Sequence, residues 1–129
     1  MAKLVYPELG YKIIGALFEV YNRLGNGYKE KYYQRALEQQ LKEIGLSYKR
    51  ELQVNLTFRN QKIGKYFLDF LVENKVVLEL KTKPRFTYED FRQVSSYLRV
   101  NKLKLGILVN FRGEKLIYKR ILNLEIRIY

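Results

Sequence analysis

The chain has 129 residues, a length that favours one domain spanning residues 1–129 with a core of its own. It contains no cysteine and no histidine, which excludes disulfides, thiolate or imidazole metal sites and histidine-based catalysis. Lys and Arg number 25 against 13 Asp and Glu, a net charge of +12. A polyanion, nucleic acid first, is therefore the expected partner.

A membrane location is not expected. The apolar stretch Ile13–Tyr21 is interrupted by Glu19 and is too short to span a bilayer. The N-terminus lacks the layout of a signal peptide. We therefore expect a cytoplasmic protein with no membrane partner.

Two helices are predicted in the first third of the chain. Apolar residues recur at helical spacing from about residue 7 to residue 24. The segment Leu24–Gly27 breaks this pattern with Gly and Asn. A second apolar stripe runs from about Lys29 to Ile44, and Gly45 ends it.

Three strands are predicted next. Residues 52–58 alternate apolar and polar side chains, as a half-buried strand does. Residues 59–62 indicate a turn, after which 64–72 and 75–81 read as the second and third strands. Residues 73–75 (ENK) join these two strands as a short loop.

The remaining pattern predicts a helix over 86–100 and a nearly continuous apolar strand over 104–111. Such a strand is typical of a sheet interior covered on both faces. Residues 115–121 and 124–129 read as closing strands. The order α-α-β-β-β-α-β-β predicts an α/β domain with a mixed sheet flanked by helices. The terminal strand leaves a homodimer open, since an edge strand can pair between chains.

Three charged residues, Asp69, Glu79 and Lys81, interrupt the most apolar strands. With a three-residue loop, pairing of Val72 with Val76 places Asp69 opposite Glu79, with Cβ atoms about 5 Å apart. Lys81 projects from the same face as Glu79. Opposed carboxylates repel, and Mg²⁺ or Mn²⁺ would relieve the repulsion. The alternative from spacing alone is a solvated polar face.

This D…ExK spacing resembles the catalytic core of the PD-(D/E)XK nuclease superfamily. GYKEKYY (Gly27–Tyr33) matches G-x-x-E-x-x-Y, the motif of the GxxExxY family within it. QVSSY (Gln93–Tyr97) is similar to its Q-x-x-x-Y, and LKLGILVNF (Leu103–Phe111) to its next strand. The resemblance extends in order from about Leu9 to Arg120. It implies a restriction-endonuclease-like core and a metal-dependent nuclease acting on DNA.

The resemblance also implies roles for single residues. The implied metal ligands for Mg²⁺ or Mn²⁺ are Glu30, Asp69, Glu79 and the backbone carbonyl of Leu80. Lys81 would position the attacking water or stabilise the transition state. Gln93 and Tyr97 would line the site from the helix that follows. Each has an alternative from the residues themselves: Glu30 suits the first turn of a helix through its dipole, Gln93 fits a boundary amide, and Tyr97 fits simple packing.

The basic residues that could contact nucleic acid lie near the D…ExK segment. Lys83 and Arg85 follow the ExK strand, and Arg92 and Arg99 share the outer face of the next helix. Contacts with phosphates alone would give binding with little sequence preference. The alternative function is an inactive nucleic-acid-binding or protein-interaction module of the same fold.

Overall fold

A computed structural model describes residues 4–127 of the chain. It contains three helices and five strands in the predicted order. The elements are α1 (Pro7–Leu24), α2 (Glu30–Glu43), β1 (Tyr48–Phe58), β2 (Gln61–Val72), β3 (Val76–Lys81), α3 (Tyr88–Val100), β4 (Leu105–Asn110) and β5 (Ile117–Leu122).

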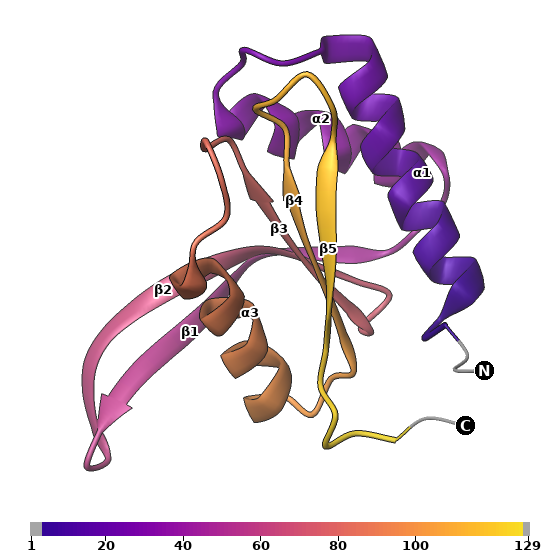
Figure 1. The fold of residues 1–129 in the computed structure, drawn as a ribbon. Coiled ribbons are helices and arrows are strands. Elements are labelled where there is room, and N and C mark those ends of the chain that lie inside the picture. The colour runs from indigo at the N-terminus through magenta and orange to yellow at the C-terminus, as the bar shows by residue number, and fades with distance from the viewer. Residues whose placement is uncertain (1–3, 128–129) are drawn as a thin grey trace.

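The five strands form one mixed sheet in the order β1-β2-β3-β4-β5. β3 and β4 are parallel and are joined through α3, while the other neighbours are antiparallel. α1 and α2 cover one face of the sheet and α3 covers the other (Figure 1). The predicted α/β class with a mixed sheet flanked by helices is therefore confirmed.

The central strands are buried from both sides. All six residues of β4 are buried, as the continuous apolar run predicts. The side chains of β3 alternate between the two cores: Leu78 and Leu80 pack toward α1 and α2, and Val77 packs toward α3. Glu79 and Lys81 follow Val77 at intervals of two residues and so lie on the α3 face.

Some element boundaries differ from the sequence prediction. β1 begins at Tyr48 rather than at residue 52. The turn that follows has only two residues between the strands, Arg59 and Asn60, with φ of 50° and 65°. Two positive φ values in succession fit a type I′ hairpin turn, whose twist matches the flanking strands. The two strands are therefore longer than their alternating pattern indicates.

The start of α3 also differs, because Thr87 caps it. The helix begins at Tyr88 rather than at residue 86. Asp90 Oδ2 accepts a hydrogen bond from the Thr87 backbone N–H at 2.8 Å, and Thr87 Oγ1 accepts one from the Asp90 N–H at 3.4 Å. This reciprocal capping satisfies backbone donors that a helix start leaves free.

The predicted strand over 124–129 is not formed in its described part. Residues 124–127 make a turn and irregular structure, and residues 128 and 129 lie outside the described residues. The outer strands of the sheet are β1 and β5. The pairing between chains that residues 124–129 left open therefore has no strand in residues 124–127.

The β2–β3 ladder ends immediately before the acidic residues. The predicted register is confirmed at Val72↔Val76, Leu71↔Val77 and Phe70↔Leu78, and the ladder stops there. The prediction that Asp69 and Glu79 lie directly opposite each other on a continuous ladder is therefore wrong.

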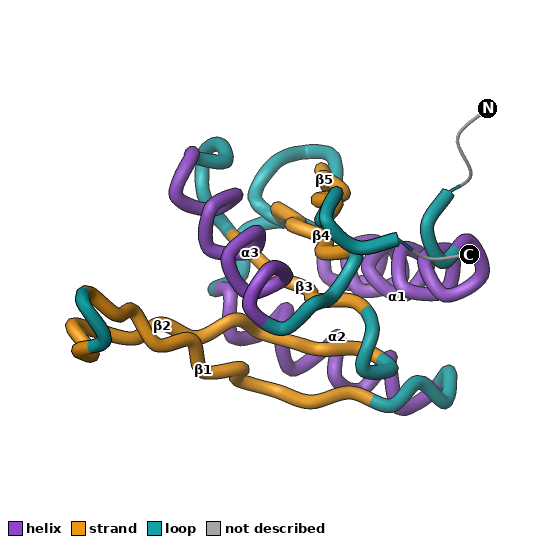
Figure 2. Tube along the Cα trace, turned by 90° about the horizontal axis from the view of Figure 1, so that it is seen from below, coloured by secondary structure: helices purple, strands orange, loops and turns teal. Residues whose placement is uncertain are grey.

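Asp69 also marks a reversal of the side-chain alternation in β2. Leu68 and Leu71 both pack in the core under α3, although alternation would place them on opposite faces. Across the strand pair, Glu51 has a φ of 54° and is missing from the β1–β2 ladder between Arg50 and Leu52. In both strands the side chains therefore exchange faces of the sheet, at Glu51 and at Asp69. The distal hairpin projects beyond the rest of the molecule (Figures 1 and 2).

Within residues 4–127, no helix combines the length and the apolar character that crossing a bilayer requires.

A substitution at Gly106 can test how closely α3 packs on the sheet. A Cβ at this β4 position would lie 2.5 Å from Val94 Cγ1. We expect Gly106→Ala to lower the free energy of unfolding by about 1–3 kcal/mol through overpacking, measured by urea denaturation. Adding Val94→Ala should restore part of the loss.

Gly15 on α1 is the matched control, since a Cβ there would meet nothing within 4 Å. Gly15→Ala should stabilise the protein by about 0.5–1 kcal/mol through helix propensity. Equal effects of the two substitutions would contradict close packing at Gly106.

Candidate active site

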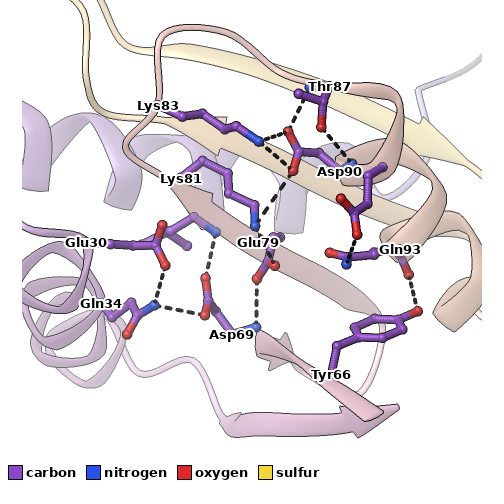
Figure 3. Close-up of polar contacts among 12 residues, drawn as sticks. Glu30, Gln34, Tyr66, Asp69, Glu79, Lys81, Lys83, Thr87, Asp90 and Gln93 are labelled. Carbon is purple, nitrogen blue, oxygen red and sulfur yellow. Dashed lines mark hydrogen bonds and ion pairs between the residues drawn. The ribbon is translucent and has the colours of Figure 1, made fainter. Parts of the chain in front are cut away.

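The carboxylates of Asp69 and Glu79 fill the space where β2 leaves β3 (Figure 3). The Asp69 backbone N–H donates to Glu79 Oε1 at 3.1 Å, and the Leu80 N–H donates to Asp69 Oδ2 at 2.7 Å. Each side chain therefore accepts the backbone hydrogen bond that the ladder no longer makes. This exchange fixes both carboxylates without a regular strand pair.

Gln34 of α2 joins Asp69 to Glu30. Its Nε2 donates to Asp69 Oδ1 at 2.9 Å and lies 3.3 Å from Glu30 Oε2. Glu30 is the first residue of α2, and Gln34 follows it by one helical turn on the same face. The structure therefore brings Glu30 to the edge of the acidic pair, with an amide between them.

Arg50 of β1 orients this amide. Its Nη2 lies 3.5 Å from Gln34 Oε1, and its Nη1 donates to Glu38 Oε1 at 3.2 Å. Its Nε donates to the Asp69 backbone carbonyl at 3.3 Å, and the guanidinium lies over the Phe70 ring at 4.5 Å. Because Arg50 occupies the amide oxygen, the amide nitrogen of Gln34 is directed at the carboxylates.

Two lysines lie on the α3 side of the acidic pair. Lys81 Nζ is 3.3 Å from Glu79 Oε2 and 3.8 Å from Asp90 Oδ1. Lys83 Nζ donates to Asp90 at 2.8 and 3.0 Å. Asp90, which is 4% exposed, is thus held mainly by Lys83, and the closer carboxylate partner of Lys81 is Glu79 (Figure 3).

Asn110 fixes the backbone that carries Lys83. Its Nδ2 donates to the Lys83 carbonyl at 2.7 Å, and its Oδ1 accepts from the Lys83 N–H at 3.3 Å. The same Oδ1 accepts from the Arg112 N–H at 3.1 Å. This buried amide at the end of β4 holds the loop that leaves β3 next to the end of its parallel neighbour.

Burial and mutual repulsion perturb the acidic pair. Glu79 is 4% exposed, and burial together with the Asp69 carboxylate raises its pKa to about 9. Burial also raises the pKa of Asp69, although hydrogen bonds from Glu79 and the Leu80 N–H oppose the shift. At neutral pH Glu79 therefore retains a proton.

The flanking charged groups respond to the same environment. Burial raises the pKa of Glu30, and the Asp69 charge adds to this effect. Burial alone would lower the pKa of Lys81, but the carboxylates of Glu79 and Asp90 outweigh it and leave the pKa raised. Lys81 thus remains an ammonium ion beside the pair.

The two α3 residues implied by the resemblance are less closely connected to the pair. The Gln93 side chain lies 3.4 Å from Glu89 Oε1, and its backbone carbonyl accepts a hydrogen bond from the Tyr66 hydroxyl at 3.1 Å (Figure 3). Tyr97 packs against the core under α3, where burial raises its pKa. The roles of Gln93 and Tyr97 beside the acidic pair therefore stay predictions.

The predicted nucleic-acid contacts occupy two environments. Lys83 is paired with Asp90 and belongs to the charged cluster itself. Arg85, Arg92 and Arg99 are exposed on the loop after β3 and on α3. Arg99 follows Arg92 by about two helical turns, which separates the two by roughly 10 Å along the axis.

The donor set is suited to a hard divalent cation. Carboxylate oxygens are the ligands that Mg²⁺ and Mn²⁺ prefer, and a cation would replace the proton on Glu79. Within residues 4–127, no group of three or more acidic side chains converges as a metal site, so Glu30 does not complete a triad with the pair. Leu80 contributes its N–H to Asp69.

Sequence reasoning did not identify Gln34, Arg50, Asn110 or the pairing of Lys83 with Asp90. Gln34 had a usable signal, since it lies four residues after Glu30 on one helix face. Arg50 and Asn110 had none, because their contacts depend on how β1 and β4 lie beside distant segments.

A family model described as the PD-(D/E)XK nuclease superfamily matches residues 7–121. Among solved structures, the chain is similar to the crystal structure of SSO0001, with a TM-score of 0.55 and 14% sequence identity. That match covers 90% of this chain and 77% of the other, and at this identity it bears on the fold. No curated protein matches the sequence.

The protonated state of Glu79 predicts the pH dependence of stability without metal. Its pKa is about 9 in the folded protein against an ordinary value of 4.5, so the folded state retains a proton that the unfolded state has released. Stability should fall as pH rises between these values, by up to about 1.4 kcal/mol per pH unit. Urea denaturation in EDTA from pH 5.5 to 8.5 measures this slope.

Glu79→Gln should make that slope shallower by the amount that corresponds to about one proton released on unfolding. Glu114→Gln on an exposed loop should leave the slope unchanged. A wild-type slope equal to that of Glu79→Gln would show that Glu79 carries no proton in the folded state.

Proposed function

Because the chain belongs to the PD-(D/E)XK nuclease superfamily, we propose that it is a divalent-metal-dependent nuclease that hydrolyses the phosphodiester bonds of DNA. The observation that carries the proposal is the pair of half-buried Asp69 and buried Glu79, with the Lys81 ammonium 3.3 Å from Glu79. Membership in the superfamily implies a nucleic acid substrate, and the net charge of +12 favours a polyanion.

Asp69 and Glu79 would hold the metal ion in this proposal. A bound Mg²⁺ or Mn²⁺ lowers the pKa of its water and neutralises a phosphate oxygen. The protein has already brought the two carboxylates together at a cost, seen in the pKa of Glu79 near 9. Glu30, set back behind the Gln34 amide, would act on the pair through that amide.

Lys81 would supply fixed positive charge where negative charge develops in the transition state. The pairing of Lys83 with Asp90 supports this assignment. Asp90 is 2.8 Å from Lys83 and 3.8 Å from Lys81, so Lys83 satisfies the carboxylate that would otherwise draw Lys81 away from Glu79.

Gln34 and Arg50 would act as positioning residues. The Gln34 amide holds one Asp69 oxygen, the Leu80 N–H holds the other, and Arg50 holds the amide. A carboxylate restrained at both oxygens loses little freedom when it binds a cation, which is the benefit of preorganisation.

We propose the finer assignment to the GxxExxY family on the strength of Gly27, Glu30 and Tyr33. Glu30 lies beside the acidic pair through Gln34. The fully buried Tyr33 stacks on Phe111 at 4.4 Å, and its hydroxyl donates to the Gly25 carbonyl at 2.6 Å. The motif thus supplies one charged residue and the aromatic residue that anchors the start of α2.

Metal binding is the first test. Millimolar Mg²⁺ or Mn²⁺ should raise the melting temperature, because an ion at 100 times its dissociation constant adds about 2.7 kcal/mol of stability. Glu79→Gln should lose this response and Glu114→Gln should keep it. A wild-type melting temperature that does not change with either ion would contradict the metal site.

Cleavage by the Lys81→Ala variant is the second test. Loss of one preorganised charge stabiliser costs about 10²–10³ in rate, whereas the affinity for DNA should change little in a chain with 25 basic residues. The measurements are Mg²⁺-dependent cleavage of plasmid and linear DNA, and DNA binding in EDTA.

The control is Lys119→Ala on β5, where the side chain is exposed. Lys83→Ala should give an intermediate loss of rate, because it frees Asp90 to compete for Lys81. If Lys81→Ala and Lys119→Ala cut equally, or if the wild type cuts no DNA, the protein is a binding module of the same fold.

A further inference from the structure

The distal part of the β1–β2 hairpin is a projecting arm, which we define as residues 53–67. Figures 1 and 2 show it extending past the helices and the other strands. Its root is fixed, because Leu52 and Leu68 pack with Val94 and Leu98 in the core under α3. The Tyr66 hydroxyl adds a hydrogen bond to the Gln93 carbonyl at 3.1 Å. The arm is thus a rigidly rooted ribbon rather than a loose loop.

The arm exposes apolar side chains. Leu56 is 47% exposed, Phe58 59%, Ile63 68% and Phe67 48%. Single exposed apolar residues are ordinary on protein surfaces, but here four occur on one short ribbon. Leu56 and Phe67 lie on opposite faces of the ribbon, so both faces offer apolar contacts. Nothing else in the described chain covers the ribbon at these positions.

The charge of the arm indicates the kind of partner. Arg59, Lys62 and Lys65 are its charged residues, and it contains no Asp or Glu. Arg59 lies over the Phe58 ring at 5.3 Å and Lys65 over the Phe67 ring at 5.8 Å. Two copies of such an arm would repel each other, so a polyanion fits the surface better than a second copy of the chain.

The position of the arm connects it to the acidic pair. Leu68, at the root, directly precedes Asp69, so a nucleic acid lying along the arm would pass the proposed catalytic residues. The strand Leu52–Phe58 extends about 20 Å, which corresponds to about six base pairs of DNA.

We propose that the arm lies in the major groove of duplex DNA beside the bond to be cut, with Arg59, Lys62 and Lys65 contacting phosphates. This inference rests on the proposed nuclease function and adds the substrate form and a contact surface to it. A two-stranded β-ribbon fits the major groove of B-DNA. The major groove of duplex RNA is too deep and narrow for side chains to enter.

The test compares two variants that each lose three positive charges. One is Arg59→Gln/Lys62→Gln/Lys65→Gln on the arm. The control is Lys12→Gln/Lys42→Gln/Lys119→Gln, on exposed positions of α1, α2 and β5. Binding to a 20-base-pair DNA duplex is measured by fluorescence anisotropy in EDTA between 50 and 200 mM salt. Thermal melting and light scattering establish folding and mass.

We expect the slope of log affinity against log salt to fall by about 3 in the arm variant and to change little in the control. The single variant Lys62→Gln should lower it by about 1. Equal slopes in the two triple variants would overturn the proposal, as would equal binding of duplex RNA. A wild-type dimer that the arm variant converts to a monomer would assign the arm to self-association instead.

The nuclease proposal is tested separately, by DNA cleavage by the wild type in Mg²⁺ or Mn²⁺. The absence of cleavage would contradict it. Loss of slope in the arm variant without any wild-type cleavage would leave the arm as a DNA contact on an inactive domain. Cleavage by the wild type together with an unchanged salt slope in the arm variant would support the nuclease proposal and contradict the role of the arm in DNA binding.

Discussion

The β2–β3 ladder ends at the pair Phe70↔Leu78, and the separation of the two strands beyond this pair is the constraint on which the rest of the site depends. A ladder that stops inside a sheet leaves backbone donors without partners, and such donors are costly when buried. Here Glu79 accepts the Asp69 N–H, and Asp69 accepts the Leu80 N–H. The carboxylates are therefore needed by the fold before they serve any chemistry, and the fold in turn holds them close enough to repel.

This double role explains why the charges can remain in the interior. Asp69 is restrained by Gln34, and Lys81 supplies positive charge beside Glu79. Burial, together with the residual repulsion from Asp69, raises the pKa of Glu79 to about 9. A buried group with a strongly shifted pKa beside a specific charged partner is a candidate functional position.

The sequence predicted the order of elements, the mixed sheet and the three-residue loop between β2 and β3, because these depend on local periodicity and turn residues. It also placed Asp69, Glu79 and Lys81 in one neighbourhood through the register of a single hairpin. It could not predict that the ladder ends at Phe70, since this follows from the turnover of both strands at Glu51 and Asp69. The contacts of Arg50 and Asn110 join segments far apart in the chain, so no local pattern reveals them.

Asp90 has a consequence for local motion. It closes the first turn of α3 through Thr87 and also binds Lys83. Fraying of that turn would release the Lys83 ammonium in the same event, so the helix start and the lysine loop should open as one cooperative unit in native-state hydrogen exchange. The amides of Thr87 and Asp90 would then report, through a common opening free energy, on the fraction of molecules in which Lys83 is released from Asp90.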